Sequence, residues 1–174
     1  MTTKIKKIWN TIANILVIII VLLAIALAGV RLFGVKPYAV LSGSMEPTYH
    51  VGSLIYVKST DIKDLKVGDP ITFVLPDETV ATHRIINITT DENDPDKLAF
   101  ETQGDANKLP DGEPVHENNI IGKPLFSIPL LGYLSHFIQN PPGLYISIAI
   151  GAVVLFIVFL PDILFDDKKN KKSK

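Results

Sequence analysis

The sequence predicts a mainly β domain flanked by two transmembrane α-helices. The chain of 174 residues is 47% hydrophobic overall, but its apolar residues are concentrated in two blocks, Ile12 to Val30 and Leu144 to Leu160. Between the blocks, short apolar or alternating runs are separated by Gly, Pro and Asp. Such runs are typical of strands, because successive side chains of a strand point to opposite faces. We therefore expect two lipid-matched helices and one small β domain.

Both apolar blocks are long enough to cross a membrane. At 1.5 Å per residue, their helices would measure about 28 Å and about 26 Å, close to the roughly 30 Å of a bilayer's hydrocarbon core. The first block has one polar residue near its start, Asn14, and no charge from there to Val30. The second follows Pro141-Pro142-Gly143, where a helix would break and restart.

Lysines at both ends of the chain indicate the orientation. Cationic segments beside membrane spans tend to stay in the cytoplasm, and in the middle of this chain acidic residues outnumber basic ones. We therefore expect a multi-pass plasma-membrane protein, in contact with membrane lipid, with both termini cytoplasmic. Its predicted parts are a cytoplasmic N-terminus (1–11), a first span (12–30), an extracytoplasmic catalytic domain (31–143), a second span (144–160) and a Lys-rich cytoplasmic tail (161–174).

A second interpretation of the first block is a cleavable secretory signal, because Ala26-Leu27-Ala28 precedes Gly29. The apolar run is longer than the usual core of such a signal, which favours a retained span. Both interpretations place the middle of the chain outside.

The middle segment is predicted to be rich in strands, bounded by turns such as Gly68-Asp69-Pro70. From Leu125 to Ile138 we expect a strand, a turn and a short amphipathic piece that faces the membrane. The expected strands are Tyr38–Leu41, Ser53–Lys58, Ile71–Leu75, Val80–Thr90, Lys97–Thr102 and Asn119–Ile121.

Composition excludes several kinds of site. The chain has no cysteine, so disulfides, a thiol nucleophile, zinc–thiolate sites and iron–sulfur clusters are ruled out. It has no Gly-rich phosphate loop and no basic patch interleaved with aromatic residues, so no nucleotide or nucleic acid is expected. The acidic stretch from Asp91 to Asp96 could hold calcium, but Pro95 at a ligand position and the lack of Gly at the sixth position favour a solvated turn. We expect no metal and no cofactor.

Three kinds of residue could together form a serine nucleophile with its base. In Ser42-Gly43-Ser44-Met45-Glu46-Pro47, Ser44 lies 14 residues after the end of the first block, and the segment would expose a serine at a sharp turn, although alone it is typical of a plain turn. A serine needs a base beside it, and His83 lies in the strongest strand signal. Asp105 and Asp111, in turn sequences after a strand, could each orient that base.

The order of these segments resembles the successive conserved boxes of type I signal peptidases. The resemblance covers roughly Tyr38 to Tyr133. His83 stands where the bacterial branch of the family has a lysine base, so the chain is similar to the archaeal and endoplasmic-reticulum branch, which SipW-like proteins of Gram-positive bacteria share. The matching segments are Ser42–Pro47, Lys66–Asp69, His83–Ile85 and Gly104–Asn107.

The resemblance implies a role for each site residue. Ser44 would be the nucleophile, His83 the general base and Asp111 the residue that orients it, with Asp105 nearby. Pro110-Asp111-Gly112 departs from the paired aspartates that are frequent in the family, so the choice between the two carboxylates stays open. Ser42 and the Ser44 backbone N–H match the oxyanion-hole positions.

The resemblance also implies the substrates. They would be signal-peptide-bearing preproteins that emerge from the translocase and are cut at small-x-small sites on the outer face of the membrane.

Two alternatives remain at this stage. The chain could be a non-catalytic two-span protein, such as an accessory subunit or an inactive paralogue, that displays a β domain. The completeness of the set of site residues argues against this. Alternatively, Ser44 could use a lysine such as Lys58 or Lys97 as its base.

Overall fold

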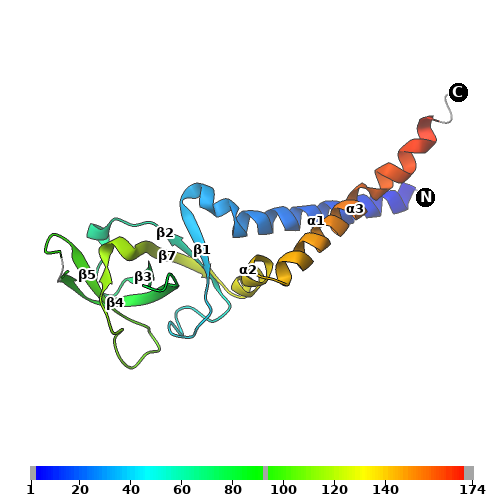
Figure 1. The fold of residues 1–174 in the computed structure, drawn as a ribbon. Helices are drawn as coiled ribbons and strands as arrows, with labels where there is room; N and C mark the ends of the chain where they lie inside the picture. Colours follow the sequence, from blue (N-terminus) through cyan, green and yellow to red (C-terminus); the bar gives the residue numbers. More distant parts are fainter. Residues whose placement is uncertain (1–2, 92–93, 171–174) are drawn as a thin grey trace. The chain divides into compact units, whose positions relative to one another are not determined.

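The computed structural model describes residues 3–91 and 94–170 (Figure 1). The chain divides into two compact units. One is the domain Ala28–His136, and the other comprises the two terminal segments with their long helices.

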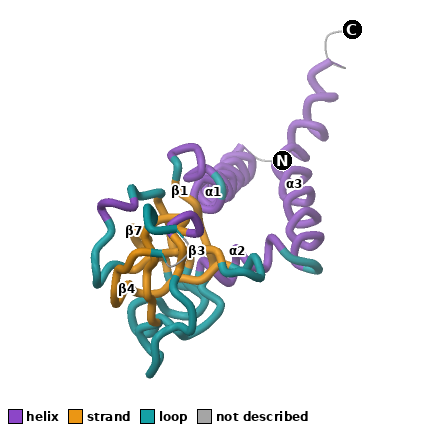
Figure 2. The backbone as a smooth tube through the Cα atoms, turned by 60° about the vertical axis from the view of Figure 1, so that its left-hand side comes forward, coloured by secondary structure: helices purple, strands orange, loops and turns teal. Residues whose placement is uncertain are grey.

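The domain is built on an antiparallel sheet of seven strands, which confirms the predicted mainly β fold. The strands are arranged in the order β1-β2-β7-β3-β4-β5-β6, so β7 is inserted between β2 and β3. Figure 2 shows the loops that leave this sheet. The strands are β1 (Val35–Ala39), β2 (Leu54–Lys58), β3 (Pro70–Val74), β4 (Val80–Thr90), β5 (Leu98–Gln103), β6 (Val115–His116) and β7 (Ile120–Ile128).

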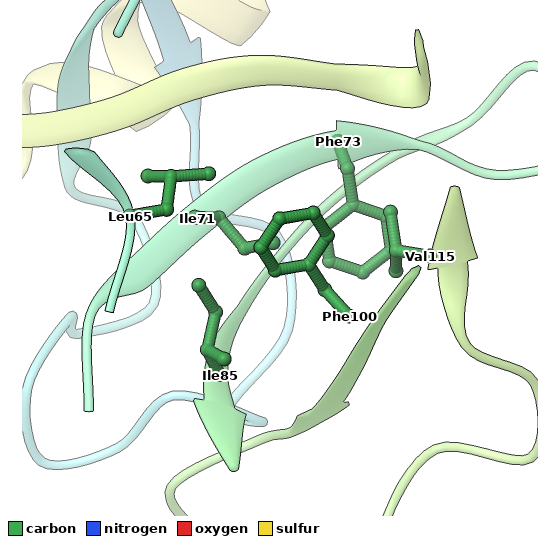
Figure 3. Close-up of a cluster of buried hydrophobic side chains, with 6 residues drawn as sticks. All are labelled: Leu65, Ile71, Phe73, Ile85, Phe100 and Val115. Carbon is green, nitrogen blue, oxygen red and sulfur yellow. The ribbon is translucent and has the colours of Figure 1, made fainter. Parts of the chain in front are cut away.

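The core of the domain lies on one face of β3, β4, β5 and β6. Ile85 of β4 is 1% exposed and belongs to this cluster. Because alternate residues of a strand share a face, the core that holds Ile85 also fixes the direction of His83 two residues earlier. The cluster drawn in Figure 3 consists of Leu65, Ile71, Phe73, Ile85, Phe100 and Val115.

The first apolar block forms a helix, with limits different from those expected. Helix α1 (Thr3–Leu27) begins nine residues before Ile12 and ends three residues before Val30. A 3-10 helix follows at once, η1 (Gly29–Phe33). Gly29 is a poor helix former, which suits the end of α1 at this point. The stretch Lys7–Leu27 is long and apolar enough to cross a membrane, and none of its most apolar window is buried.

The second apolar block lies in a helix that is long and apolar enough to cross a membrane only when it is taken together with the helix before it. Helix α2 (Leu131–Gln139) and helix α3 (Gly143–Asn170) are separated by a short break that contains Pro141-Pro142. The described segments Leu131–Gln139 and Gly143–Phe159 meet the criteria together, with a bend of 94°. The described residues therefore contain one candidate span, or two if the bent pair forms one.

The limits of α3 differ from those expected for the second span. It starts at Gly143 and continues to Asn170, into the predicted tail, whose residues 171–174 lie outside the described residues.

The segment from Leu125 to Ile138 has the expected sequence of elements. It contains the end of β7, a turn in which Leu130 has a φ of 64°, and the start of α2. Within α2, Gly132 and Ser135 are buried while Tyr133 is 55% exposed, so the helix is amphipathic.

Candidate active site

Ser44 lies on the loop that joins β1 to β2. Met45 is 2% exposed and anchors this loop in the domain. The Tyr49 N–H donates to the Met45 carbonyl over 2.9 Å, which closes one turn of chain just after Ser44. Ser44 itself is partly exposed, so its hydroxyl is accessible while its backbone is held.

Glu46 closes the far side of the same loop. Its carboxylate accepts the Val51 N–H over 3.1 Å and is 2.5 Å from His50 Nδ1. The His50 hydrogen bond, followed by that from the Val51 amide, lowers the pKa of Glu46. Glu46 and His50 therefore stabilise the loop at neutral pH and lie apart from the Ser44 hydroxyl in the hydrogen-bond network.

His83 joins Ser44 to Asp111. It lies in β4, paired with Ile71 of β3, and its Nε2 is 3.1 Å from Ser44 Oγ. Its Nδ1 is 2.5 Å from Asp111 Oδ2. A carboxylate on Nδ1 selects the tautomer with the proton on Nδ1 and leaves Nε2 free to accept the serine proton. The three side chains therefore have the arrangement that general-base catalysis by a serine requires.

Asp105 binds Arg84 and not His83. It accepts from Arg84 Nε over 2.8 Å and from Nη2 over 2.6 Å, and Thr48 Oγ1 also donates to it. The Arg84 hydrogen bonds hold the pKa of Asp105 below its usual range, and Asp105 in turn raises the pKa of Arg84. His83 and Arg84 are neighbours on β4, so their side chains lie on opposite faces. This alternation explains why each of the two carboxylates has its own partner.

The turn after β5 also holds the loop that carries Ser44. The Ala106 N–H donates to the Ser44 carbonyl over 2.9 Å. Gly104 passes so close that a Cβ there would lie 2.6 Å from the Ser44 carbonyl oxygen. A glycine is needed because a side chain would push the two loops apart. The Gly104–Asn107 segment therefore sets the position of the Ser44 backbone.

The predicted oxyanion-hole residues lie side by side. Ser42 Oγ is 3.3 Å from Ser44 Oγ, and Ser42 is exposed. The structure thus brings Ser42, Ser44, His83 and Asp111 together, and it places Asp105 in a separate set of hydrogen bonds with Arg84 and Thr48.

A cleft of about 680 Å³ opens beside Ser44 and His83. Its walls come from two stretches, the end of β1 with the loop after it and the start of β4, and most of its lining is apolar. Burial raises the pKa values of Tyr38 and Tyr49, two of the lining residues. A second hollow of about 370 Å³ borders the Asp111 side of His83.

The two lysines predicted as alternative bases are not among the hydrogen-bond partners of the Ser44 side chain in the described residues. Lys97 Nζ is 3.9 Å from Asp94 in the turn between β4 and β5, and Lys58 is exposed at the end of β2. Of the candidate bases, His83 is the one whose hydrogen bond with Ser44 Oγ is seen in the described residues.

Two aspartates of the acidic stretch from Asp91 to Asp96 pair with basic side chains, Asp91 with His116 and Asp94 with Lys97. Asp91 lies 3.5 Å from His116 Nε2. Within residues 3–91 and 94–170, no group of three or more His, Cys, Asp or Glu side chains has the arrangement of a metal site.

Sequence reasoning missed Thr102 and Arg84. Thr102 Oγ1 donates to Asp111 Oδ2 over 2.6 Å, and Arg84 holds Asp105. A threonine inside a strand gives no motif signal, because threonine is common in strands. Arg84 stands directly after the predicted base, and only the alternation of strand side chains could have assigned it to a separate network.

Comparison with known proteins gives a consistent family assignment. The family described as "Signal peptidase, peptidase S26" matches residues 11–99. Signal peptidase I W of Bacillus subtilis is 44% identical over 121 residues, which are 63% of this chain and 62% of that protein. The human signal peptidase complex catalytic subunit SEC11C is 28% identical over 126 residues, 67% of this chain and 65% of that subunit. The aligned part of this chain thus spans less than two thirds of each relative.

Proposed function

Because the chain belongs to the signal peptidase family, peptidase S26, we propose that it is a membrane-bound serine endopeptidase that removes N-terminal signal peptides from exported preproteins. Its similarity to the Bacillus subtilis signal peptidase and to SEC11-type subunits is consistent with the SipW-like and endoplasmic-reticulum branch of that family. The observation that carries the proposal is the contact of His83 with Ser44 on one nitrogen and with Asp111 on the other.

The first half of the reaction forms an acyl-enzyme. His83 Nε2 takes the proton of Ser44 Oγ as this oxygen attacks the scissile carbonyl carbon. The Asp111 carboxylate stabilises the imidazolium that forms. The imidazolium then gives its proton to the leaving amine as the C–N bond breaks, and the signal peptide remains as an ester on Ser44.

The second half of the reaction releases the signal peptide. Water attacks the ester carbonyl, His83 takes the proton of the water, and the same proton returns to Ser44 Oγ when the C–O bond breaks. In both halves, the Ser44 N–H and the Ser42 hydroxyl would donate to the oxyanion. One such donor contributes about 2.7–4 kcal/mol in another serine protease.

The cleft beside Ser44 suits an extended substrate. Two of its walls are the end of β1 with the residues just after it, from Tyr38 to Leu41, and the start of β4, from Val80 to His83, so a peptide could add its backbone to them as a further strand. The apolar lining favours uncharged side chains, a condition that the small residues of small-x-small cleavage sites meet. The substrates proposed are preproteins that emerge from the translocase.

The proposed membrane arrangement follows from the helices and the charges. Helix α1 would hold the domain at the outer face of the plasma membrane, and α3 would form a second span. Both termini would then lie in the cytoplasm, where their lysines are favoured. This arrangement would present Ser44 to cleavage sites that also emerge at the membrane surface.

The proposal is tested by precursor processing in membranes that contain the wild-type chain or its Ser44→Ala variant. We expect the variant to lose at least about 10³-fold in rate, because the nucleophile is gone, while the protein remains inserted. A serine-acylating inhibitor should label the wild type alone. If neither protein processes any precursor of a broad panel and neither is labelled, the chain is a non-catalytic member of its family.

The identity of the base is tested in the same membranes with His83→Ala. The contact of His83 with Ser44 predicts a loss as large as that of Ser44→Ala. If His83→Ala retains the wild-type rate, a lysine acts as the base and the role given to His83 is wrong.

A further inference from the structure

We propose that Thr102 is a positioning residue of the peptidase, whose hydroxyl holds the Asp111 carboxylate in the orientation that His83 needs. This inference rests on the proposed function. Thr102 belongs to β5, pairs with Ile85 of β4, and is 1% exposed. It makes no direct contact with Ser44 or His83 in the hydrogen-bond network of the described residues, and its effect would pass through Asp111.

The geometry joins Thr102 to Asp111 by two hydrogen bonds. Thr102 Oγ1 donates to Asp111 Oδ2 over 2.6 Å, and the Asp111 N–H donates to the Thr102 carbonyl over 2.8 Å. The first fixes the carboxylate and the second fixes the backbone that carries it. Asp111 lies in a loop, outside regular structure, so these bonds to a buried strand residue give it a rigid support.

Both partners of the carboxylate use the same oxygen. His83 Nδ1 lies 2.5 Å from Asp111 Oδ2, the atom that also accepts from Thr102. A carboxylate can rotate about its Cβ–Cγ bond and exchange its two oxygens, because this terminal torsion is soft. A second donor on Oδ2 opposes the rotation, so this oxygen remains aimed at Nδ1. The imidazole is then held with Nε2 directed at Ser44.

Burial makes this hydrogen bond effective. Thr102 is 1% exposed, so its hydroxyl cannot replace the hydrogen bond to Asp111 with one to water unless the sheet opens. The Asp111 side chain is 24% exposed, so water alone would hold it loosely. A buried donor beside a partly exposed acceptor is the arrangement expected of a support for a reactive group.

The test compares Thr102→Val and Thr102→Ser in the full-length protein, purified in detergent, with a synthetic signal-peptide substrate. Valine keeps the shape of threonine and lacks the hydroxyl, so we expect kcat to fall about tenfold while KM stays within twofold. Serine keeps the donor and should restore kcat to within about threefold of the wild type. A role limited to folding would change the amount of active protein and would not follow the presence of the hydroxyl.

Thr72→Val is the matched control. Thr72 is a buried strand threonine, 0% exposed, whose hydroxyl pairs with Thr82 at 2.8 Å and not with Asp111. We expect this variant to keep kcat within about twofold of the wild type. If Thr72→Val and Thr102→Val lower kcat equally, the effect belongs to the sheet in general and the inference is overturned.

A double-mutant cycle tests the route through Asp111. If Thr102 acts by orienting this carboxylate, Thr102→Val should have almost no further effect on kcat in an Asp111→Asn background. An undiminished tenfold loss in that background would show that Thr102 acts elsewhere.

The two levels of proposal fail in different ways. A wild type without Ser44-dependent cleavage would remove the proposed function. An active wild type with an equally active Thr102→Val would remove this inference alone.

Discussion

At the scale of single residues, Asp105 and Asp111 are two carboxylates of neighbouring turns with different partners. Asp111 contacts His83, whereas Asp105 is held by two nitrogens of Arg84. Asp111→Asn should therefore lower kcat by about 10⁴-fold, because an amide in this place favours the wrong histidine tautomer. Asp105→Asn should lower kcat less than tenfold. Steady-state kinetics on both variants checks this, and a larger loss in Asp105→Asn would exchange the two roles.

The ion pair of Asp105 with Arg84 predicts a pH dependence of stability. Asp105 has a lowered pKa because Arg84, then Thr48, donates to its ionised form. Its contribution to the free energy of unfolding is fully present above the unfolded value of about 3.9 and is lost as the pH falls through the lower folded pKa. The melting temperature of the wild type should therefore fall more steeply below about pH 4 than that of Asp105→Asn.

Thermal melts of both proteins in detergent at a series of pH values measure this difference. Parallel curves for the two proteins would show that the Arg84 pair does not contribute to stability.

Much of the site could be predicted from the residues, and the part that could not has a physical reason. The resemblance to signal peptidases rests on the order of Ser44, His83 and the two later aspartates, and it assigns these residues to one site. The choice between Asp105 and Asp111 depended on which face of β4 each one meets, and the spacing of turn residues does not contain that information. Thr102 had no signal at all, because its role arises from a contact across the sheet.

At the scale of elements, the start of α2 packs against the turn before β2 through two glycines. The Gly132 N–H donates to the Gly52 carbonyl over 2.9 Å, and a Cβ on Gly132 would overlap the Ser53 carbonyl oxygen. Gly52 has a φ of 81° and lies under the ring of Tyr133. Close approach of the two backbones therefore requires glycine at position 132.

Gly132→Ala should destabilise the domain by about 1–3 kcal/mol, because the added methyl group has no room and the backbone must shift. We expect the melting temperature to fall by several degrees. Gly151→Ala in α3 is the control, since a Cβ there meets nothing within 4 Å. Equal melting temperatures for Gly132→Ala and the wild type would show that α2 moves away at little cost.

The limits of elements were less predictable than their existence. β7 continues through Pro124, whereas the sequence predicts two separate pieces, one on each side of this proline. The proline is tolerated because the β2–β7 register shifts between Tyr56 and Val57, at the position paired with it. β6 has only two residues, too few to show alternation. The register shift therefore explains how β7 continues through the proline, and the short length of β6 explains why this strand was not predicted.

At the scale of the whole molecule, the number of spans decides where the termini lie. Helix α1 alone would leave the domain and everything after it on one side, whereas a second span through α3 would return the C-terminus to the cytoplasm. The 94° bend between α2 and α3 separates an amphipathic segment from an apolar one. In the proposed arrangement α2 would lie at the membrane surface and α3 would form the span, with the two prolines of the break ending one helix before the next begins.

The absence of cysteine from the chain makes this topology directly testable, because each introduced cysteine is then the sole thiol. In right-side-out membrane vesicles, a membrane-impermeant maleimide should label Lys63→Cys, an exposed position of the domain. It should label Thr2→Cys and Ser173→Cys only after detergent is added, because positive flanks favour the cytoplasmic side. The cysteine-free wild type measures the background. Labelling of Ser173→Cys in intact vesicles, with Thr2→Cys protected, would mean that α3 does not cross the bilayer and that the chain has a single span.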